Sequence, residues 1–305
     1  MAVGFQNQGN SCSANSALQC VAHTPELSSF FLKSDSVRGE IAIEFRKVVR
    51  VIWNNASKSV KPGPKLTNPS VQPDAQEYLD FLLGALDQEF KKQENPPKGQ
   101  KVRPELPSPV ADFFEGQTKS TVKCPKCSNM VSSTPDSFTS LSLPVHETAQ
   151  PVSLESCIRE YTKDDVLDSW HCPKCKRNQK DAVKKLELGK LPRNLILHLA
   201  RFKCDSSGSV EKIDTTVEFP QILTLWEQEY KLYGLINHMG DSDYGHYTAT
   251  IKLPNGKWYS FDDEVVEEIF ELSRRRAFTI MDNPNPAKPA SEIDKIGFNF
   301  IWIMD

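Results

Sequence analysis

Apolar residues recur with helical spacing in three stretches of the N-terminal third. The first stripe begins just after Cys12 and predicts a helix that either Asn10 or Ser11 can cap. Similar stripes over 40–53 and 72–90 predict a second and a third helix. The stretches 54–71 and 91–109 are polar and rich in proline, which predicts surface loops and ends the helical region near residue 110.

From residue 113 onward the pattern changes to short alternating segments, which predicts mainly β-structure. The apolar run 191–202 follows turn residues and fits a buried central strand. Further strands are predicted at 231–236, 246–253, 257–261 and 298–304. Helices followed by a sheet indicate an α+β protein.

Composition narrows the possible partners. The 305 residues are 38% hydrophobic and 25% charged, enough for one large or two ordinary globular domains. A net charge of −3 gives no basic field for nucleic acid, so protein partners are expected. There is neither a signal-peptide pattern nor an apolar run long enough to cross a membrane, so we expect an intracellular protein.

Eight cysteines include two CxxC pairs, Cys124 with Cys127 and Cys172 with Cys175. In a reducing compartment such pairs are more plausibly metal ligands than disulfides. Each pair resembles a knuckle in which two thiolates on a tight turn face one cation, and together they supply four soft ligands. The sequence therefore predicts a structural zinc site that clamps the tips of two hairpins.

Cys12 is a candidate nucleophile because it stands at the predicted start of a helix, where unpaired N–H groups and the helix dipole favour a thiolate. A small buried core cysteine is the alternative interpretation. A cysteine nucleophile needs a base and a group that orients the base. His246 fits the base because it begins a strand after a polar loop, and either Asp262 or Asp263 on the next predicted strand is placed to orient it.

Over nearly its whole length the chain resembles the catalytic domain of the ubiquitin-specific proteases, a family of cysteine deubiquitinases. The ordered motifs that carry the resemblance are highly specific together. They are Gly4 to Cys12 with Asn15-Ser16 and Leu18-Gln19, then Gln72, Asp74-Ala75 and Glu77, both CxxC pairs, Leu191-Pro192, His198-Leu199, Arg201-Phe202, Phe219-Pro220, Gly245-His246-Tyr247, and Trp258 with Phe261-Asp262-Asp263.

The resemblance implies a papain-like hand with a zinc-ribbon finger subdomain. Residues 1–305 then form a single catalytic domain, with a helical thumb over 1–110. Residues 111–190 are expected to form mainly the zinc-bearing fingers. Residues 191–305 are expected to form mainly the β-rich palm, together with part of the fingers.

The resemblance also implies roles for single residues. The catalytic set is Cys12 as nucleophile, His246 as general base and acid, Asp262 as the residue that orients His246, and Asn7 as the oxyanion-hole side chain. Gln72, Asp74 and Tyr247 fall where the family contacts the extended ubiquitin tail. Asp74 has a second interpretation, as the cap of its helix.

The implied reaction is hydrolysis of the isopeptide bond after the C-terminal glycine of ubiquitin through a cysteine thioester. The implied partners are ubiquitin and ubiquitinated proteins, the cofactor is structural Zn²⁺, and a monomer in the cytoplasm or nucleus is expected. Two alternatives stay open: the same chemistry on a ubiquitin-like modifier such as SUMO, and a catalytically weak ubiquitin-binding scaffold. The chain departs from the family pattern at Ser13 and Ala14, where the family usually has an aromatic and a bulky apolar residue.

Overall fold

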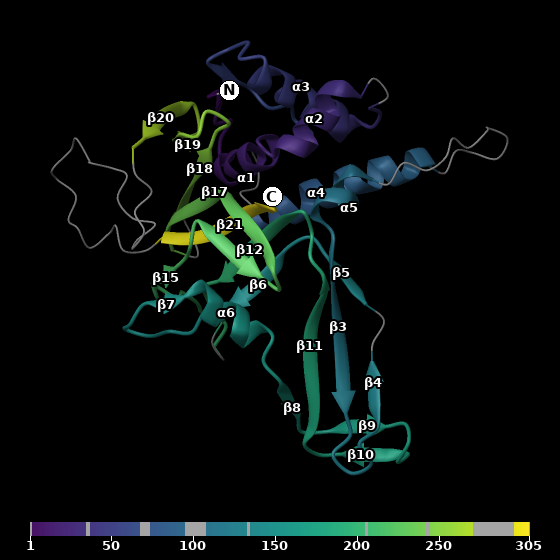
Figure 1. Cartoon of the computed structure of the whole chain (residues 1–305). Coiled ribbons are helices and arrows are strands. Elements are labelled where there is room, and N and C mark those ends of the chain that lie inside the picture. The colour runs from purple at the N-terminus through teal and green to yellow at the C-terminus, as the bar shows by residue number, and fades with distance from the viewer. Residues whose placement is uncertain are drawn as a thin grey trace.

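The computed structural model describes residues 2–34, 37–67, 74–94, 108–132, 135–204, 207–241, 245–270 and 296–304. Figure 1 shows helices above, a sheet at the centre, and a long β-extension that reaches away from both. We keep the names thumb, palm and fingers for these three parts. The helices are α1 (Cys12–Ala22), α2 (Pro25–Lys33), α3 (Glu40–Trp53), α4 (Ala75–Glu94), α5 (Pro109–Phe114) and α6 (Leu154–Tyr161).

The predicted helix after Cys12 is confirmed as α1, and every one of its residues is buried. Small side chains such as Ala14 and Ala17 let neighbouring elements approach it closely, and it packs against α4 and strand β18 (Gly245–Lys252). Ser11 occupies the N-cap position, but its hydroxyl caps no N–H of α1 and instead accepts a hydrogen bond from the Gln8 N–H at 3.0 Å. The first residue of this helix, Cys12, is thereby held at the junction of thumb and palm.

The second predicted helix, 40–53, is confirmed as α3 with the same bounds. The third is confirmed as α4, which continues to Glu94 and so overruns the loop predicted from Lys91. Three short helices, α2, α5 and α6, were not predicted. Each has nine residues or fewer, so its apolar stripe covers too few turns to stand out.

The palm is an eight-stranded sheet with the order β20-β19-β18-β17-β21-β12-β6, and β16 pairs with β17 outside this path. The C-terminal strand β21 lies between β17 and β12, and β6 pairs with β12 in parallel. The strands predicted from the sequence in this region are all present. Their bounds are β6 (Leu141–Pro144), β12 (Asn194–Ala200), β16 (Ile222–Leu225), β17 (Gln228–Gly240), β18 (Gly245–Lys252), β19 (Trp258–Asp262), β20 (Val265–Ile269) and β21 (Ile296–Met304).

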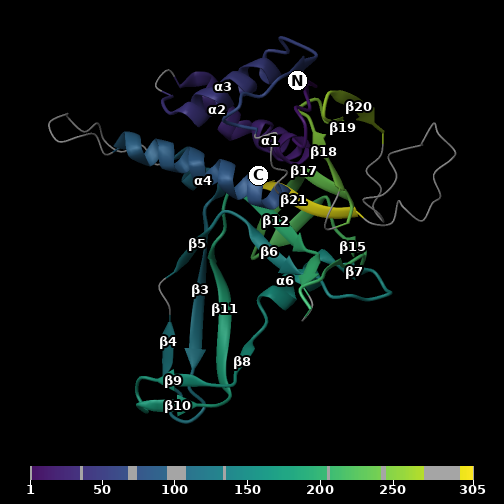
Figure 2. The ribbon, with the colours of Figure 1, turned by 180° about the vertical axis from the view of Figure 1, so that it is seen from behind.

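The fingers are a five-stranded sheet with the order β4-β3-β11-β8, in which β5 also pairs with β3. Figures 1 and 2 show the strand pair β9–β10 at its far end, away from α1 and the palm. Residues 141–161 leave the fingers, because β6 joins the palm sheet. The finger strands are β3 (Gly116–Lys123), β4 (Met130–Ser132), β5 (Asp136–Phe138), β8 (Asp165–Leu167), β9 (Trp170–Cys172), β10 (Arg177–Gln179) and β11 (Ala182–Lys190).

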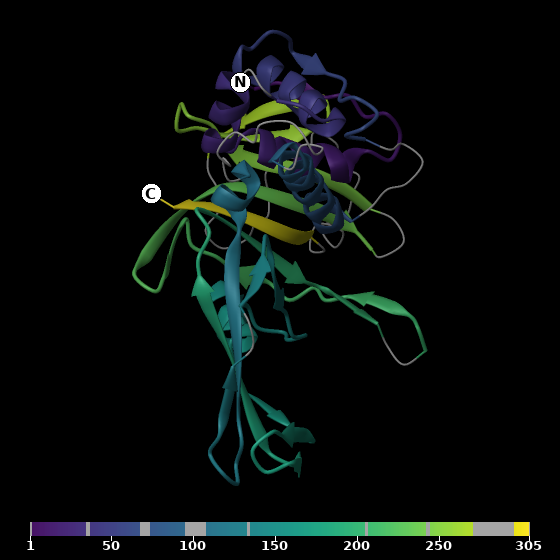
Figure 3. The same ribbon diagram turned by 90° about the vertical axis from the view of Figure 1, so that its right-hand side faces the viewer.

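Three small strand pairs complete the fold. The side view in Figure 3 shows one of them, the β13–β14 hairpin, projecting from the palm. The pairs are β1 (Gly4–Phe5) with β2 (Ser59–Val60), β13 (Phe202–Cys204) with β14 (Val210–Lys212), and β7 (Val152–Ser153) with β15 (Val217–Glu218).

The palm sheet separates two hydrophobic cores. Side chains alternate between the faces of a strand, so Ile196 of β12 joins the core shared with the thumb, whereas Leu195 and Leu197 join the core that α6 covers. Burial of apolar surface on both faces makes the sheet a rigid base for the residues at its edge. None of the described helices is long and apolar enough to span a bilayer.

Candidate active site and cysteine cluster

Three separate elements bring Cys12, His246 and Asp262 together. Cys12 is the first residue of α1, His246 is the second residue of β18, and Asp262 is the last residue of β19. The β18–β19 hairpin turns through residues 253–257, where Gly256 takes the positive φ of +81° that the turn requires. This pairing places the two strand ends side by side, and α1 packs directly on β18.

Hydrogen bonds favour the protonated state of His246. Its Nε2 lies 2.6 Å from Asp262 Oδ1, and Cys12 is within hydrogen-bonding reach of the imidazole. The hydrogen bond to Asp262 and then the bond to Cys12 raise the pKa of His246 to about 10, against partial burial, which acts in the opposite direction. An imidazolium beside a sulfur at a helix N-terminus is the arrangement that stabilises a thiolate.

Asp263 has a different set of partners. Its Oδ2 accepts a hydrogen bond from Asn7 Nδ2 at 2.8 Å, and its Oδ1 accepts one from Asn15 Nδ2 at 2.7 Å. The Asn7 Oδ1 accepts from the Gly9 N–H at 2.9 Å and from the Ser11 hydroxyl at 3.2 Å. Because two donors face one end of the Asn7 amide and an acceptor faces the other, the positions of its oxygen and nitrogen are fixed.

The backbone around Asp263 is tightly packed against the N-terminal strand. Its carbonyl accepts from the Phe5 N–H at 2.7 Å, and its φ of 50° is left-handed, which asparagine and aspartate tolerate better than most residues. A Cβ built on Gly4 would lie 2.5 Å from the Glu264 carbonyl oxygen and 2.8 Å from that of Asp263. Only glycine fits here, since both obstacles are backbone atoms.

Asp74 and Tyr247 are also in contact. The Tyr247 hydroxyl donates to Asp74 Oδ2 at 2.8 Å, while Asp74 Oδ1 accepts the Gln76 N–H at the start of α4. Asp74 therefore does cap its helix, and it bridges thumb and palm at the same time. Burial and the Asp74 charge raise the pKa of Tyr247, so its hydroxyl stays protonated and keeps donating. Gln72 lies outside the described residues.

His238 packs behind Tyr247, with ring centroids 4.5 Å apart. Burial and the nearby Lys212 ammonium lower the pKa of His238 to about 4, so this ring is neutral and serves as packing. The His238 ring also lies against Gly245, and only glycine fits there because a Cβ would overlap His238 Nε2.

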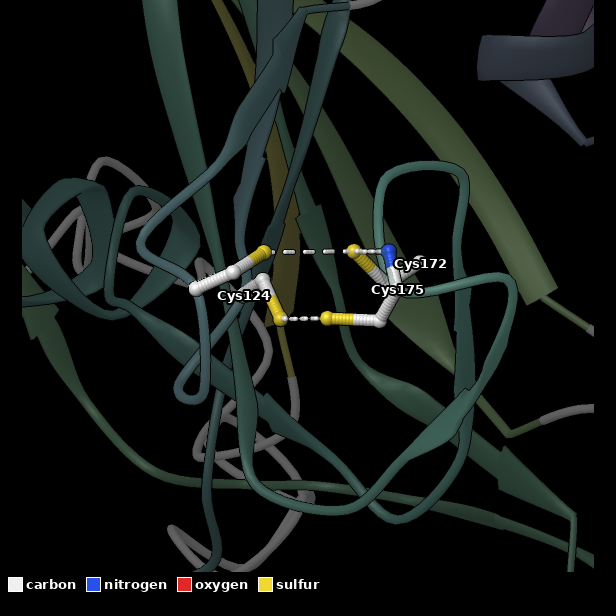
Figure 4. Close-up of side chains that lie close together, drawn as sticks. Cys124, Cys172 and Cys175 are labelled. Carbon is white, nitrogen blue, oxygen red and sulfur yellow. Dashed lines mark hydrogen bonds between the residues drawn. The ribbon is translucent and has the colours of Figure 1, made fainter.

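At the far end of the fingers the four cysteines of the CxxC pairs form one cluster. Their sulfur atoms all lie within 4.8 Å of one another, with Cys124 3.9 Å from Cys175 and Cys127 3.6 Å from Cys172. Figure 4 shows the side chains from the two turns pointing toward a common centre. One turn joins β3 to β4 and the other joins β9 to β10, which confirms the prediction of two hairpin tips.

The cluster fits a tetrahedral zinc ion. Zn–S bonds of about 2.3 Å place neighbouring sulfurs about 3.8 Å apart, close to the observed separations. Desolvation raises the pKa of Cys124, but the Cys127 and Lys126 N–H groups outweigh it and bring the pKa to about 6. Hydrogen bonds from the neighbouring cysteines raise the pKa of Cys175 to about 12. The Cys124 thiolate therefore forms readily, whereas the Cys175 thiol stays protonated unless a cation lies beside it.

Comparison with known proteins identifies the family. The sequence profile described as "Ubiquitin carboxyl-terminal hydrolase" matches residues 3–284. The chain belongs to the ubiquitin carboxyl-terminal hydrolase family. This family assignment agrees with the resemblance to ubiquitin-specific proteases found in the sequence.

Human ubiquitin carboxyl-terminal hydrolase 2 is 32% identical over 314 residues, covering 86% of this chain and 51% of the human protein. Human ubiquitin carboxyl-terminal hydrolase 21 is 32% identical over 340 residues, covering 88% of this chain and 59% of that protein. The chain thus spans between half and three fifths of the length of these curated members of the hydrolase family.

Among solved structures, a yeast SAGA deubiquitinating module with a mutant Sgf73 matches with a TM-score of 0.76 and 25% identity, over 99% of this chain and 68% of that one. The module of Ubp8, Sgf11, Sus1 and Sgf73 bound to monoubiquitin has a TM-score of 0.77 at 24% identity, over 99% of this chain and 69% of that one, and supports the hydrolase fold. The expected papain-like α+β hand is confirmed.

Sequence reasoning missed one part of this site. It treated Asp263 only as a second choice for orienting His246 and gave Asn15 no role, whereas the two join Asn7 in one network. A signal was present, because two adjacent aspartates at a strand end cannot both point toward the same imidazole.

Proposed function

We propose that this chain is a cysteine deubiquitinase that cleaves the bond after the C-terminal glycine of ubiquitin. The observation that carries the proposal is the joining of Cys12, His246 and Asp262 from three elements at the start of a buried helix. The family assignment supports the same reaction class. A buried core cysteine, the alternative for Cys12, would not need an imidazole beside it.

The first step is attack by the Cys12 thiolate on the glycine carbonyl carbon. The carbonyl π electrons move to oxygen and give a tetrahedral oxyanion. His246 then donates its proton to the departing lysine amine as the C–N bond breaks, which leaves a thioester on Cys12. In the second half His246 removes a proton from water, the hydroxide attacks the thioester, and the thiolate departs.

Asn7 is the proposed oxyanion donor. The amide nitrogen has two N–H groups, and Asp263 holds one of them at 2.8 Å, which leaves the other for the oxyanion. Because Gly9 and Ser11 hold the amide oxygen, the group is oriented before substrate binds. A preorganised donor of this kind is worth about 3 kcal/mol of transition-state stabilisation.

Asp74 and Tyr247 are proposed to line the channel for the extended ubiquitin tail. Their hydrogen bond connects α4 to β18 at the point where thumb and palm meet, next to His246 in sequence. A tail that ends in two glycines needs a narrow channel, and a fixed bridge between the two walls keeps it narrow. Gln72 is proposed for the same channel.

We further propose that the fingers hold structural zinc through Cys124, Cys127, Cys172 and Cys175. Four thiolate ligands complete a tetrahedral shell, so the ion would stabilise the fold and take no part in the reaction. None of the eight cysteines is in a disulfide, and we propose a reducing compartment such as the cytoplasm or nucleus.

Turnover of ubiquitin that carries a C-terminal fluorogenic amide tests the activity. We expect hydrolysis by the native chain, none by Cys12→Ala, and native-like hydrolysis by Cys204→Ala, which removes an exposed cysteine outside the site. The same substrate built on SUMO tests the modifier and should be hydrolysed far more slowly. Ubiquitin binding without turnover would favour the ubiquitin-binding scaffold. Faster hydrolysis of the SUMO substrate would favour the same chemistry on a ubiquitin-like modifier.

A further inference from the structure

The two CxxC turns bring basic residues to the fingertip. Each turn reads Cys-Pro-Lys-Cys, with Lys126 in the first and Lys174 in the second. Lys123 precedes the first turn and Lys176 follows the second, so four lysines are direct neighbours in sequence of the clustered cysteines. Arg177, the first residue of β10, and Lys180, just after its end, add two more cations. All six side chains are exposed, and we call them the cationic tip.

This concentration of charge is unusual for the chain. Segments 123–132 and 168–181 contain these six cations and only two carboxylates, Asp168 and Asp181, in a protein of net charge −3. None of the six side chains is ion-paired or hydrogen-bonded within the described residues. A bound zinc ion with four thiolates would carry a net charge of −2, which six cations exceed. With Asp168 and Asp181 also counted, a net charge of about +2 remains at this end of the molecule.

An exposed apolar row lies next to the cationic tip. In the finger sheet Lys123 stands opposite Met130 on one side and Val183 on the other, and Val183 stands opposite Val166. Residues directly opposite across paired strands share a face, so these four form one row. Met130 is 67% exposed and Val166 is 58% exposed.

We propose that the fingertip docks an acidic protein surface that also presents an apolar side chain. Carboxylates of the partner would face the cationic tip, and the apolar side chain would cover Met130 and Val166. The observations favour a protein over nucleic acid because Met130 and Val166 expose apolar surface beside the charges, which a phosphate backbone would leave uncovered. Figures 1 and 2 show β9–β10 at the opposite end of the molecule from α1, so the cationic tip itself lies away from the Cys12 site.

The test measures binding of fluorescent peptides to the full zinc-loaded chain by anisotropy. One peptide is rich in glutamate and has two central leucines, a second has serines in place of the leucines, and a DNA duplex carries the same dye. The tip variant is Lys123→Glu with Arg177→Glu and Lys180→Glu, which leaves both CxxC turns intact. Its matched control reverses three exposed cations of the thumb, Lys47→Glu, Arg50→Glu and Lys58→Glu. Zinc content of each variant reports that the fingers are folded.

We expect the leucine peptide to bind more tightly than the serine peptide, and added salt to weaken both. The tip variant should lose affinity by about tenfold or more at low salt, and the thumb variant should not. Met130→Ser should bring the leucine peptide down to the serine level. Equal losses of peptide affinity in the tip and thumb variants would mean that only the overall charge of the protein matters. Tighter binding of the DNA duplex than of either peptide, with no effect of Met130→Ser, would mean that the tip binds nucleic acid. Either result, or no peptide binding, overturns the proposal.

Discussion

The Asp262 carboxylate is the largest cause of the raised pKa of His246. A folded-state pKa of about 10 lies above the ordinary histidine value of about 6.5, so the protonated ring is favoured in the folded protein. The stability that this contact contributes is fully present below about pH 6.5 and is lost as pH rises toward 10. The same proton serves the proposed reaction, which needs an imidazolium beside a thiolate.

Asp262→Asn should therefore lower the pH at which activity fails on the alkaline side. Loss of the carboxylate charge weakens the interaction that holds the proton on His246, so the alkaline limb of kcat/KM should move from near 10 toward about 6.5. The measurement is kcat/KM for the fluorogenic ubiquitin substrate across pH. Asp263→Asn is the control and should leave the limb in place, because Asp263 bonds Asn7 and Asn15. An unmoved limb in Asp262→Asn would refute the assignment.

Asp263 should act on catalysis through Asn7. Asp263→Asn keeps a residue that tolerates the left-handed backbone but removes the charge that orients the Asn7 amide, so kcat should fall about tenfold with little change in KM. Asn7→Ala should lower kcat more, by about a hundredfold. If the two act as one unit, adding Asp263→Asn to Asn7→Ala causes little further loss. Additive losses in the double variant would mean that Asp263 acts on something other than Asn7.

At the residue scale, the reactive side chains can be predicted from the sequence, but which of them contact one another follows only from the fold. Cys12, His246 and the two aspartates are recognisable from their positions at predicted element ends. Which aspartate faces His246 depends on the end of β19: Asp262 is its last residue, and Asp263 has already turned into a left-handed conformation. That change of backbone direction is set by contact with Phe5 and Gly4 at the other end of the chain, and no local pattern encodes it.

The contact between β1 and the β19–β20 turn should be sensitive to a single methyl group. Gly4→Ala places a Cβ against two backbone carbonyls, so we expect a loss of about 1–3 kcal/mol in the free energy of unfolding and reduced kcat. Gly84→Ala is the matched control, since Gly84 lies inside α4 with open space around it, and should stabilise by about 0.5–1 kcal/mol. Urea unfolding measures both. A neutral Gly4→Ala would show that the turn is free to move.

Element lengths explain which helices the sequence revealed. The apolar stripe of α3 covers nearly four turns and gives its bounds, whereas α5 is only six residues long. The proline-rich composition of 91–109 made the predicted loop too long at both ends. Pro109 was included in the loop but begins α5, where its missing N–H costs nothing. At the other end α4 continues past Lys91, whose ammonium pairs with Asp87 one turn earlier at 2.7 Å.

For the whole molecule, the two groups of candidate site residues lie at opposite ends. The reacting groups lie where thumb and palm meet, and the cysteine cluster lies at the far end of the fingers. The sequence predicted both groups, because Cys-Pro-Lys-Cys turns and the residues around Cys12 are local patterns. It could not predict that the apolar row beside the cationic tip would be exposed, since that follows from the pairing of β4, β3, β11 and β8.

Removal of zinc should damage the fingers and spare the chemistry of Cys12. A metal bound only by the folded form stabilises it, so a chelator should lower the unfolding temperature and raise KM for ubiquitin. Alkylation of Cys12 by iodoacetamide should keep its rate, because no cluster cysteine contacts the site. Cys172→Ser should behave like the chelated protein. One zinc per chain is expected by elemental analysis, and an unchanged unfolding temperature without metal would contradict the zinc proposal.

The most direct test of the central claim is intact mass spectrometry after incubation with ubiquitin that carries a C-terminal electrophile, followed by peptide mapping. We expect one ubiquitin per chain, attached at Cys12, with no adduct on Cys12→Ala and a full adduct on Cys204→Ala. An adduct mapped to any other cysteine, or no adduct on a chain that still binds ubiquitin, would contradict Cys12 as the nucleophile.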